Sequence, residues 1–438
     1  MDVNEGLKRE IGVWGLVANS INIIVGAGIF ILPVIIAERL GTGSILAYLI
    51  CGILMIFIML CFAEVGTKIT RTGGAYSYIE DAFGRYAGFI TTNVFIFGAA
   101  VMANAAVANG LANTLAYFLP FFKIQWVKVL LFALMFGGLA YMNVNCSSCF
   151  GGVRKAIFIV KFNTIAKLSP LLLIAIFGWF FVNFSNLSLT YSHSVPDLGE
   201  MSLILIFAFV GAETALNVSG EIINPRKTIP RGIMISILIV VVLYILIQMT
   251  VQGILGLSIT DFRDAPLAEA ARRMIGPAGA TIVIIGALFS MFGNISGMVL
   301  NMPRVLFAAA RDRVIPLPGL AKVHPEFLTP HVSIIIYACL GFIFASLGEF
   351  KQLAMLSSAS YLLIYLGVVF SVIKFRINRR TEEGSYIIPG GYFVPGFSAV
   401  VIIWVLSNLP LKELGAMVIF ISLLTLIYFI LKIFKLEK

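Results

Sequence analysis

The sequence predicts an all-α, polytopic membrane protein with twelve transmembrane helices. Three observations support this fold class. The 438 residues are 60% hydrophobic and only 12% charged, which is too little charge for a soluble chain of this length. The apolar residues gather in about twelve stretches, each near or above the roughly 20 residues that a bilayer-spanning helix needs. The first and sixth stretches are each interrupted by glycine, which weakens a helix.

The apolar stretches follow one another with short polar connections. No polar segment is long enough for a separate soluble domain, so residues 1–438 are expected to form a single membrane domain. In chain order the stretches lie near residues 13–37, 43–66, 87–118, 126–144, 156–183, 199–220, 231–256, 278–310, 331–348, 351–374, 393–410 and 413–434.

Twelve spans place both termini on the same side of the membrane. With the termini inside, 22 of the 31 Lys and Arg residues fall on inner segments and 8 on outer ones. Because inner loops carry the excess of positive charge, we expect cytoplasmic termini in a cell (inner or plasma) membrane. The net charge of +10 then reflects topology and attraction to anionic membrane lipid, and no nucleic-acid partner is expected.

Candidate catalytic and metal-binding residues are few. Cys146 and Cys149 have CxxC spacing, but no second pair or nearby histidine completes a zinc site. His193, His324 and His331 fall in loops or at the edges of spans. Because no HExxH, GxSxG or filter-like motif occurs, we expect neither an enzyme nor a channel, and no metal or cofactor.

The two glycine interruptions are nearly identical in sequence. Residues 25–28 read Val-Gly-Ala-Gly, and residues 210–213 read Val-Gly-Ala-Glu. A broken helix persists in hydrocarbon only beside protein, water or ligand, which satisfy the freed backbone groups. Matched broken spans in the two halves of a chain indicate the binding site of a secondary transporter. The alternative is that these glycines only allow helices to pack closely.

The backbone of such interruptions favours one kind of ligand. Amide groups at the start of a half-helix suit a carboxylate, and unwound carbonyls suit an ammonium group or another cation. A molecule that carries both groups close together is an α-amino acid, so a small-molecule amino acid substrate is expected.

Four motifs resemble those of the amino acid–polyamine–organocation permeases, in the order in which that family has them. They are Gly26–Pro33 (GAGIFILP), Arg71–Tyr78 (RTGGAYSY), Phe209–Glu213 (FVGAE) with Glu221–Arg231 (EIINPRKTIPR), and Arg304–Asp312 (RVLFAAARD) with Pro316 behind it. The resemblance implies a 5+5 inverted repeat of the leucine-transporter type, with helices 1 and 6 broken. Residues 12–183 would form the first repeat, 199–374 the inverted second repeat, and 393–434 two appended helices.

The resemblance also implies where the substrate binds. Its carboxylate would contact the amides of Ala27 and Gly28, beside the turn at Gly26. Its amine would contact carbonyls near Ile24, Phe207 and Val210, beside the second turn at Gly211. By similarity to the arginine/agmatine antiporter branch, the pocket is lined by Ala99, Ala100, Asn104, Phe207, Ala208 and Asn294.

Substrate charge is a separate prediction. Asn294 stands where that branch has a tryptophan. A buried cationic side chain needs an acidic partner, and no carboxylate clearly faces the pocket. We therefore expect neutral amino acids, moved by alternating access through proton symport or amino acid exchange. The alternative on the same fold is a polyamine or cationic amino acid antiporter, and the protein is expected to be a monomer or a homodimer.

Three residues are candidates for coupling or gating. Lys167 lies inside the fifth span, where charged residues are costly and usually functional; the resemblance places it, in the Asn163-x-x-x-Lys167 pattern, against the broken first span in place of sodium. It either carries a coupling proton or serves as a fixed structural charge. Glu213 either relays movement or a proton, or only binds helix ends. Phe207 matches a gating aromatic by resemblance, and is otherwise a core residue. Glu64 is expected to contact a nearby basic loop at the inner surface.

Overall fold

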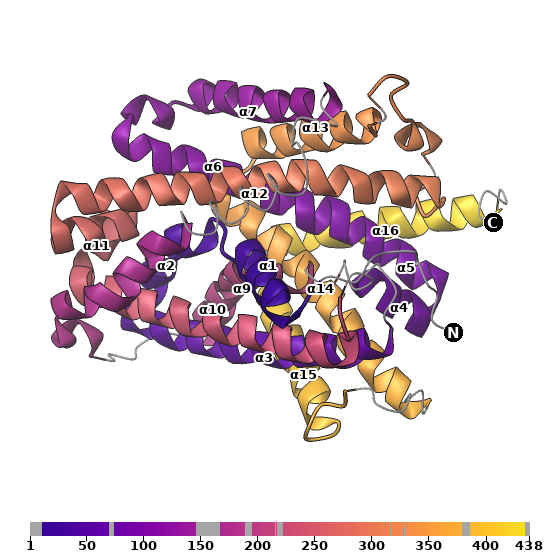
Figure 1. Cartoon of the computed structure of the whole chain (residues 1–438), viewed down its shortest axis with the longest axis horizontal. Coiled ribbons are helices and arrows are strands. Elements are labelled where there is room, and N and C mark those ends of the chain that lie inside the picture. Colours follow the sequence, from indigo (N-terminus) through magenta and orange to yellow (C-terminus); the bar gives the residue numbers. More distant parts are fainter. Residues whose placement is uncertain are drawn as a thin grey trace.

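The computed structural model describes residues 11–69, 74–145, 167–188, 195–214, 216, 222–315, 317–327, 329–378 and 386–433. Within these ranges the chain is helical, and the one β-type contact is an isolated bridge between Ile11 and Ile222. The protein is therefore all-α (Figure 1). The α-helices are α1 (Val13–Ile24), α2 (Gly28–Leu40), α3 (Ser44–Lys68), α4 (Ala75–Phe83), α5 (Arg85–Asn93), α6 (Val101–Phe118), α7 (Gln125–Asn145), α9 (Val195–Phe209), α10 (Pro225–Leu255), α11 (Pro266–Ile275), α12 (Pro277–Arg311), α13 (His331–Leu347), α14 (Phe350–Ile377), α15 (Phe393–Ser407) and α16 (Leu411–Ile433).

Short irregular helices lie between these α-helices in the described part of the chain. Two of them are π-helices, η2 (Val94–Ala100) and η4 (Leu173–Phe177). The others are 3₁₀ turns: η1 (Gly41–Gly43), η3 (Pro120–Lys123), η5 (Gly178–Phe181), η6 (Phe184–Leu187), η8 (Gly256–Asp261) and η9 (Pro318–Ala321).

Seven helical stretches in the described part of the chain are long and apolar enough to cross a membrane. They are Gly28–Lys68, Arg85–Phe118, Gln125–Asn145, Pro225–Asp261, Pro277–Arg311, Phe350–Ile377 and Leu411–Ile433, and the shorter apolar helices are Val13–Ile24, Lys167–Phe181, His331–Leu347 and Phe393–Ser407. The expectation of a polytopic membrane protein is confirmed at this level. The count of twelve spans and the 5+5 repeat stay predictions, and residues 156–166 of the fifth predicted span lie outside the described residues.

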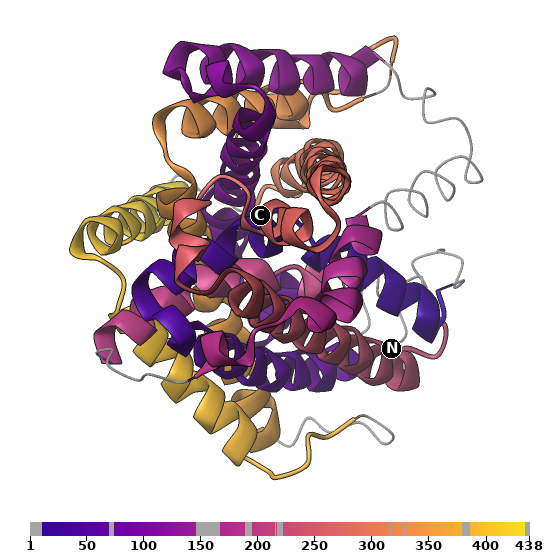
Figure 2. The same cartoon turned by 90° about the vertical axis from the view of Figure 1, so that its left-hand side faces the viewer.

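The helix packing places the interrupted helices in the interior. α12 runs along the length of the molecule, and α7 and α13 pack against each other at one edge (Figure 1). The view in Figure 2 shows the same pair at the edge, away from α3 and α10. α10 packs against both α1 and α3, and α9 packs against α2, α3 and α14. The end of α1, the start of α2 and the end of α9 are therefore buried among other helices.

The surface is apolar over much of its area. On α16, Ile419, Leu423 and Leu426 are 70%, 53% and 57% exposed, as expected of side chains that face lipid rather than water. Two amphipathic helices were not predicted from the sequence, α4 and α11. A turn at Gly276, with φ +73°, separates α11 from α12, and such a φ favours glycine because it has no Cβ.

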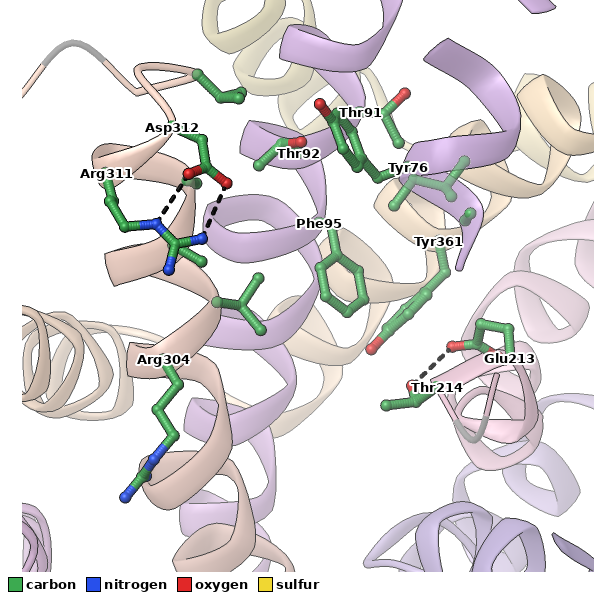
Figure 3. Close-up of a pocket in the computed structure, with 16 residues that line it drawn as sticks. Tyr76, Thr91, Thr92, Phe95, Glu213, Thr214, Arg304, Arg311, Asp312 and Tyr361 are labelled. Carbon is green, nitrogen blue, oxygen red and sulfur yellow. Dashed lines mark hydrogen bonds and ion pairs between the residues drawn. The ribbon is translucent and has the colours of Figure 1, made fainter. Parts of the chain in front are cut away.

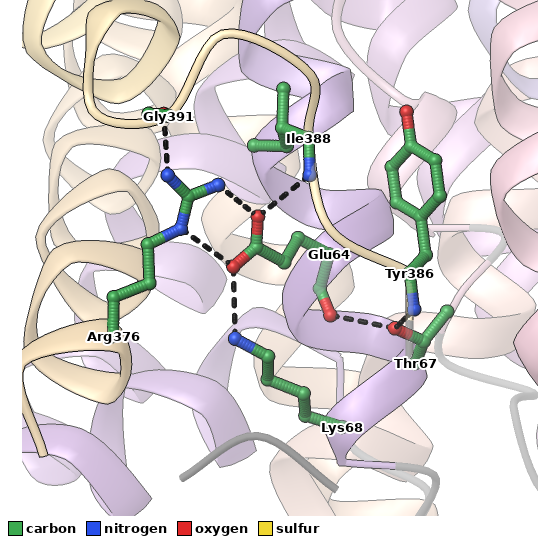
Figure 4. Close-up of polar contacts among 7 residues, drawn as sticks. All are labelled: Glu64, Thr67, Lys68, Arg376, Tyr386, Ile388 and Gly391. Carbon is green, nitrogen blue, oxygen red and sulfur yellow. Dashed lines mark hydrogen bonds and ion pairs between the residues drawn. The ribbon is translucent and has the colours of Figure 1, made fainter. Parts of the chain in front are cut away.

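A buried ionic cluster joins segments that are distant in sequence (Figure 4). The fully buried Glu64 of α3 accepts hydrogen bonds from Lys68 Nζ at 2.8 Å, from Arg376 Nε at 2.9 Å and from the Ile388 amide at 3.0 Å. Arg376 also donates its Nη2 to Glu64 and its Nη1 to the Gly391 carbonyl. The basic partners of Glu64 are therefore Lys68 of the same helix and Arg376 of α14, which is far away in sequence, and the predicted contact with a nearby basic loop is replaced by these two.

Candidate functional site

The first interruption lies between α1 and α2, where the glycines predict it. The carbonyls of residues 24–26 accept hydrogen bonds from side chains of other helices. Ser290 Oγ of α12 donates to the carbonyls of Val25 and Gly26, at 3.3 and 3.4 Å. Tyr244 of α10 donates a long hydrogen bond of 3.5 Å to the Ile24 carbonyl. The break is therefore held by protein, as a broken helix in a membrane requires.

Lys167 is the first described residue of the fifth apolar stretch, and its side chain contacts the same interruption. Its side chain is 2% exposed, and its Nζ donates to the carbonyls of Asn22 and, at 3.1 Å, of Val25. The ammonium group thus lies against the last turn of α1 and the start of the break. This is the place that the family resemblance implies for it.

The second interruption follows α9, which ends at Phe209. Gly211 has φ +119°, a conformation that favours glycine. Its amide donates to Glu213 Oε2 at 3.0 Å, and Tyr365 of α14 donates to the same oxygen at 2.7 Å. Thr214 Oγ1 donates to the other carboxylate oxygen at 3.3 Å. The Glu213 carboxylate therefore accepts a backbone hydrogen bond at the end of the broken helix, and a role in relaying movement or a proton stays a prediction.

The two interruptions are in contact with each other. A Cβ added at Gly211 would lie 2.9 Å from Ile23 Cγ2, and 3.5 Å from the Ile23 carbonyl oxygen. A Cβ added at Gly28 would lie 2.8 Å from the Ala208 Cα. Gly28 therefore allows α2 and α9 to approach at backbone distance, and Gly211 allows the chain after α9 to approach the last turn of α1. The close packing that the alternative interpretation expects is therefore present, and substrate binding at the two breaks stays a prediction.

Two further predicted residues adjoin the interruptions. Asn294 of α12 is half-buried, and its Nδ2 would lie 3.4 Å from a Cβ at Gly26. Phe207 of α9 is 6% exposed, and its ring meets that of Phe350 edge to face, with 5.7 Å between the ring centroids. Phe207 is packed as a core aromatic in this conformation.

The remaining predicted residues lie on the span formed by α5, η2 and α6. Ala99 and Ala100 end the π-helix η2, a type of segment that is frequent at functional sites. Their carbonyls accept hydrogen bonds from Ser357 at 3.0 Å and from Tyr337 at 3.3 Å, so they are tied to α14 and α13. Asn104 is fully buried, and neither its Oδ1 nor its Nδ2 has a hydrogen-bond partner among the described residues.

A cavity of about 570 Å³ begins at the second interruption. Glu213 and Thr214 line one side of it, and Phe95 and Tyr361 form a wall between them and α12 (Figure 3). The cavity extends to exposed charged residues at the end of α12. Of the predicted site residues only Glu213 lines it. The cavity therefore adjoins the second interruption but does not include the other predicted substrate-binding residues. The other lining residues are Ala75, Tyr76, Thr91, Thr92, Arg304, Val305, Ala308, Ala309, Arg311, Asp312, Val314 and Ile364.

Sequence reasoning missed the side chains that support the breaks. Ser290, Tyr244 and Tyr365 each lie in a long apolar run, where a single hydroxyl gives no periodic signal. Their role follows only from the helices that tertiary packing brings beside them. Several predicted features lie outside the described residues, namely Cys146, Cys149, Asn163, His193, Glu221, Pro316 and the Arg71–Gly73 part of the second motif. Among the described residues no group of three His, Cys, Asp or Glu side chains is placed to hold a metal ion.

Comparison with known proteins gives a consistent result over nearly the whole chain. A family model described as amino acid permease matches residues 11–433. The serine/threonine exchanger SteT of Bacillus subtilis (strain 168) is 29% identical over 402 residues, which cover 90% of this chain and 89% of the relative. The branched-chain amino acid permease BcaP of the same organism is 24% identical over 436 residues, covering 97% and 93%. Its methylthioribose transporter is 26% identical over 445 residues, covering 98% and 94%.

Proposed function

The chain belongs to the amino acid permease family of the amino acid–polyamine–organocation superfamily, and on this premise we propose that it moves neutral α-amino acids across a cell membrane by alternating access. The family and the relatives compared above are transporters rather than enzymes. The apolar helices agree with a multi-pass membrane protein.

The observation that carries the proposal is the contact between the two helix interruptions. The first amides of α2, at Gly28, have no carbonyl partner within their own helix, and they begin where Ala208 of α9 approaches at backbone distance. A carboxylate is the ligand that such a helix start binds best. The Ile24 carbonyl receives a long hydrogen bond from Tyr244 and no other side-chain donor among the described residues, so it is available to an ammonium group.

The proposed architecture is the 5+5 inverted repeat, with 1–438 as a single transport domain. Residues 12–183 and 199–374 would cross the membrane in opposite senses, and 393–434 would add two helices. Both termini would lie in the cytoplasm, as the distribution of Lys and Arg predicts. The interruptions then fall near the middle of the membrane, where transporters of this type bind their substrates.

A neutral side chain is favoured by the charges around the site. Glu213 is the one carboxylate among the described residues beside the interruptions, and donors from Gly211, Thr214 and Tyr365 already engage it. A cationic side chain would lack a free partner there. The exchanger SteT and the permease BcaP are named for neutral amino acids, whereas the methylthioribose transporter shows that a relative carries another cargo.

A transport assay tests the substrate class. Purified protein in liposomes should take up radiolabelled L-serine, L-alanine or L-leucine at least tenfold faster than L-arginine or putrescine, because a buried unpaired charge is more costly than a buried polar group. Uptake driven by an inward proton gradient would indicate symport, and uptake that requires internal amino acid and ignores pH would indicate exchange. Preferred uptake of arginine or putrescine would overturn the neutral assignment.

The same assay tests whether the interruptions form the site. Gly28→Ala adds a methyl group against the Ala208 backbone, and such overpacking costs about 1–3 kcal/mol, so uptake should fall strongly. Gly137→Ala in α7 is the matched control, because a Cβ there meets nothing within 4 Å. An equal loss of uptake in both variants, or no loss of uptake in either, would contradict the proposed site.

A further inference from the structure

Arg304 is an exposed arginine of the apolar helix α12, and it has no acidic partner among the described residues. Arg304 is on α12, seven residues before the helix ends at Arg311, which is about 10 Å along the helix axis. Its recorded hydrogen bond goes to the Leu300 carbonyl of its own helix. Among the described residues no carboxylate lies within 4.0 Å of it. A charge at such a position normally faces water or a partner and marks a ligand pathway.

Arg304 lines the cavity that begins at the second interruption. Figure 3 shows it on the α12 side, with Glu213 and Thr214 on the opposite side and the rings of Phe95 and Tyr361 above the space between them. The next arginine along α12 is already paired, since Arg311 donates to Asp312 at 2.9 and 3.3 Å. Of the two arginines that line the cavity, Arg304 is therefore the one whose guanidinium can bind an anion.

A second observation points to a polar ligand in the same cavity. Thr92 of α5 lines the cavity and is 7% exposed, and its Oγ1 has no hydrogen-bond partner in the described chain. A buried hydroxyl without a partner is uncommon, and it calls for a ligand or water. The cavity thus offers a cation and aromatic walls to one molecule, and the buried Thr92 hydroxyl in its wall has no partner of its own in the described chain.

We propose that this cavity holds a second, weaker amino acid site between the paired interruptions and the exposed end of α12, with Arg304 binding the substrate carboxylate. Guanidinium groups bind carboxylates in a bidentate manner. An amino acid that leaves the interruptions on this side passes Arg304 before it reaches solvent. The inference rests on the proposed function, since it takes the transported amino acid as the ligand.

The test compares the two faces of the membrane. Right-side-out and inside-out vesicles give the KM from each face of the membrane. The substrate is L-serine, or L-alanine or L-leucine if one of these is taken up faster. Arg304→Gln should raise the KM about tenfold from the face that carries Arg311, as expected for the loss of a charge-assisted hydrogen-bond pair. The KM from the opposite face should change less than about twofold, since the paired interruptions are intact.

Two further variants and a lipid control make the result specific. Arg304→Lys, which keeps the charge but not the bidentate geometry, should give an intermediate KM, and Arg231→Gln, at an exposed arginine of α10 that does not line the cavity, should have no effect. An unchanged KM on both faces, or an equal rise on both, would overturn the second site. So would an effect that is seen with anionic lipid and disappears in liposomes of zwitterionic phosphatidylcholine, because the headgroup of an anionic lipid would then be the ligand of Arg304. If the wild type carries no amino acid, the proposed function itself fails instead.

Discussion

Replacing Lys167 by methionine is expected to slow transport about 10- to 100-fold. The substitution keeps the length and apolar stem of the side chain but removes the donor to the Asn22 and Val25 carbonyls. A buried acceptor left without a partner costs about 1–3 kcal/mol, and each 1.36 kcal/mol corresponds to a tenfold change in rate. Because these carbonyls belong to the first interruption, the cost falls on the part of the protein that must rearrange during transport.

The proton dependence of the variant separates the two roles of Lys167. If the lysine carries the coupling proton, Lys167→Met should abolish the response of uptake to a proton gradient. If it is a fixed charge, the residual uptake of the variant should keep the pH dependence of the wild type. Lys412→Met, at an exposed lysine of α16, is the control. Wild-type transport by Lys167→Met would contradict any role of this lysine at the break.

Replacing Glu64 by alanine is expected to have the largest effect on stability. Glu64 and Lys68 have 0% and 5% of their side chains exposed, and Arg376 has 10%. Removing the carboxylate leaves two buried cations without their partner, and breaking a buried ion pair in this way costs about 3–5 kcal/mol. It also frees the Ile388 amide, so the segment before α15 keeps the hydrogen bond from the Tyr386 amide to Thr67 Oγ1 but loses this contact to α3. The apparent Tm of purified protein in detergent should fall by several degrees.

A double-mutant cycle shows whether this loss arises from the ion pair. Glu64→Gln with Arg376→Gln removes both opposite charges, so the double variant should be more stable than the sum of the single effects predicts. Glu349→Gln, at an exposed glutamate, should leave the Tm unchanged. Additive single effects would mean that Glu64 and Arg376 are not energetically coupled.

Most helix positions could be predicted because the fold depends on long apolar stretches. Predicted spans 43–66, 126–144, 331–348 and 351–374 match α3, α7, α13 and α14 within a few residues. The interruptions could be predicted for a related reason, since glycine in an apolar run has a local effect on the backbone. α4 and α11 were missed because a short amphipathic helix gives a weak signal between strong apolar stretches.

The partners of the site could not be predicted, because they depend on helix rotation and packing. Ser290 and Tyr244 look like ordinary members of apolar spans, yet both donate to the first interruption. Glu64 and Arg376 are 312 positions apart, a distance at which sequence patterns carry no pairing information. Asn104 was predicted to line the pocket; it is fully buried on α6, and its role stays a prediction.

The most direct test of the central claim is an experimental structure of the protein in lipid nanodiscs with a transported amino acid bound. We expect density for the substrate between the two interruptions, with its carboxylate within hydrogen-bonding distance of the Ala27 and Gly28 amides and its amine near the Ile24 carbonyl. Substrate density elsewhere, with the backbone of residues 25–28 and 210–213 making no contact to it, would contradict the account.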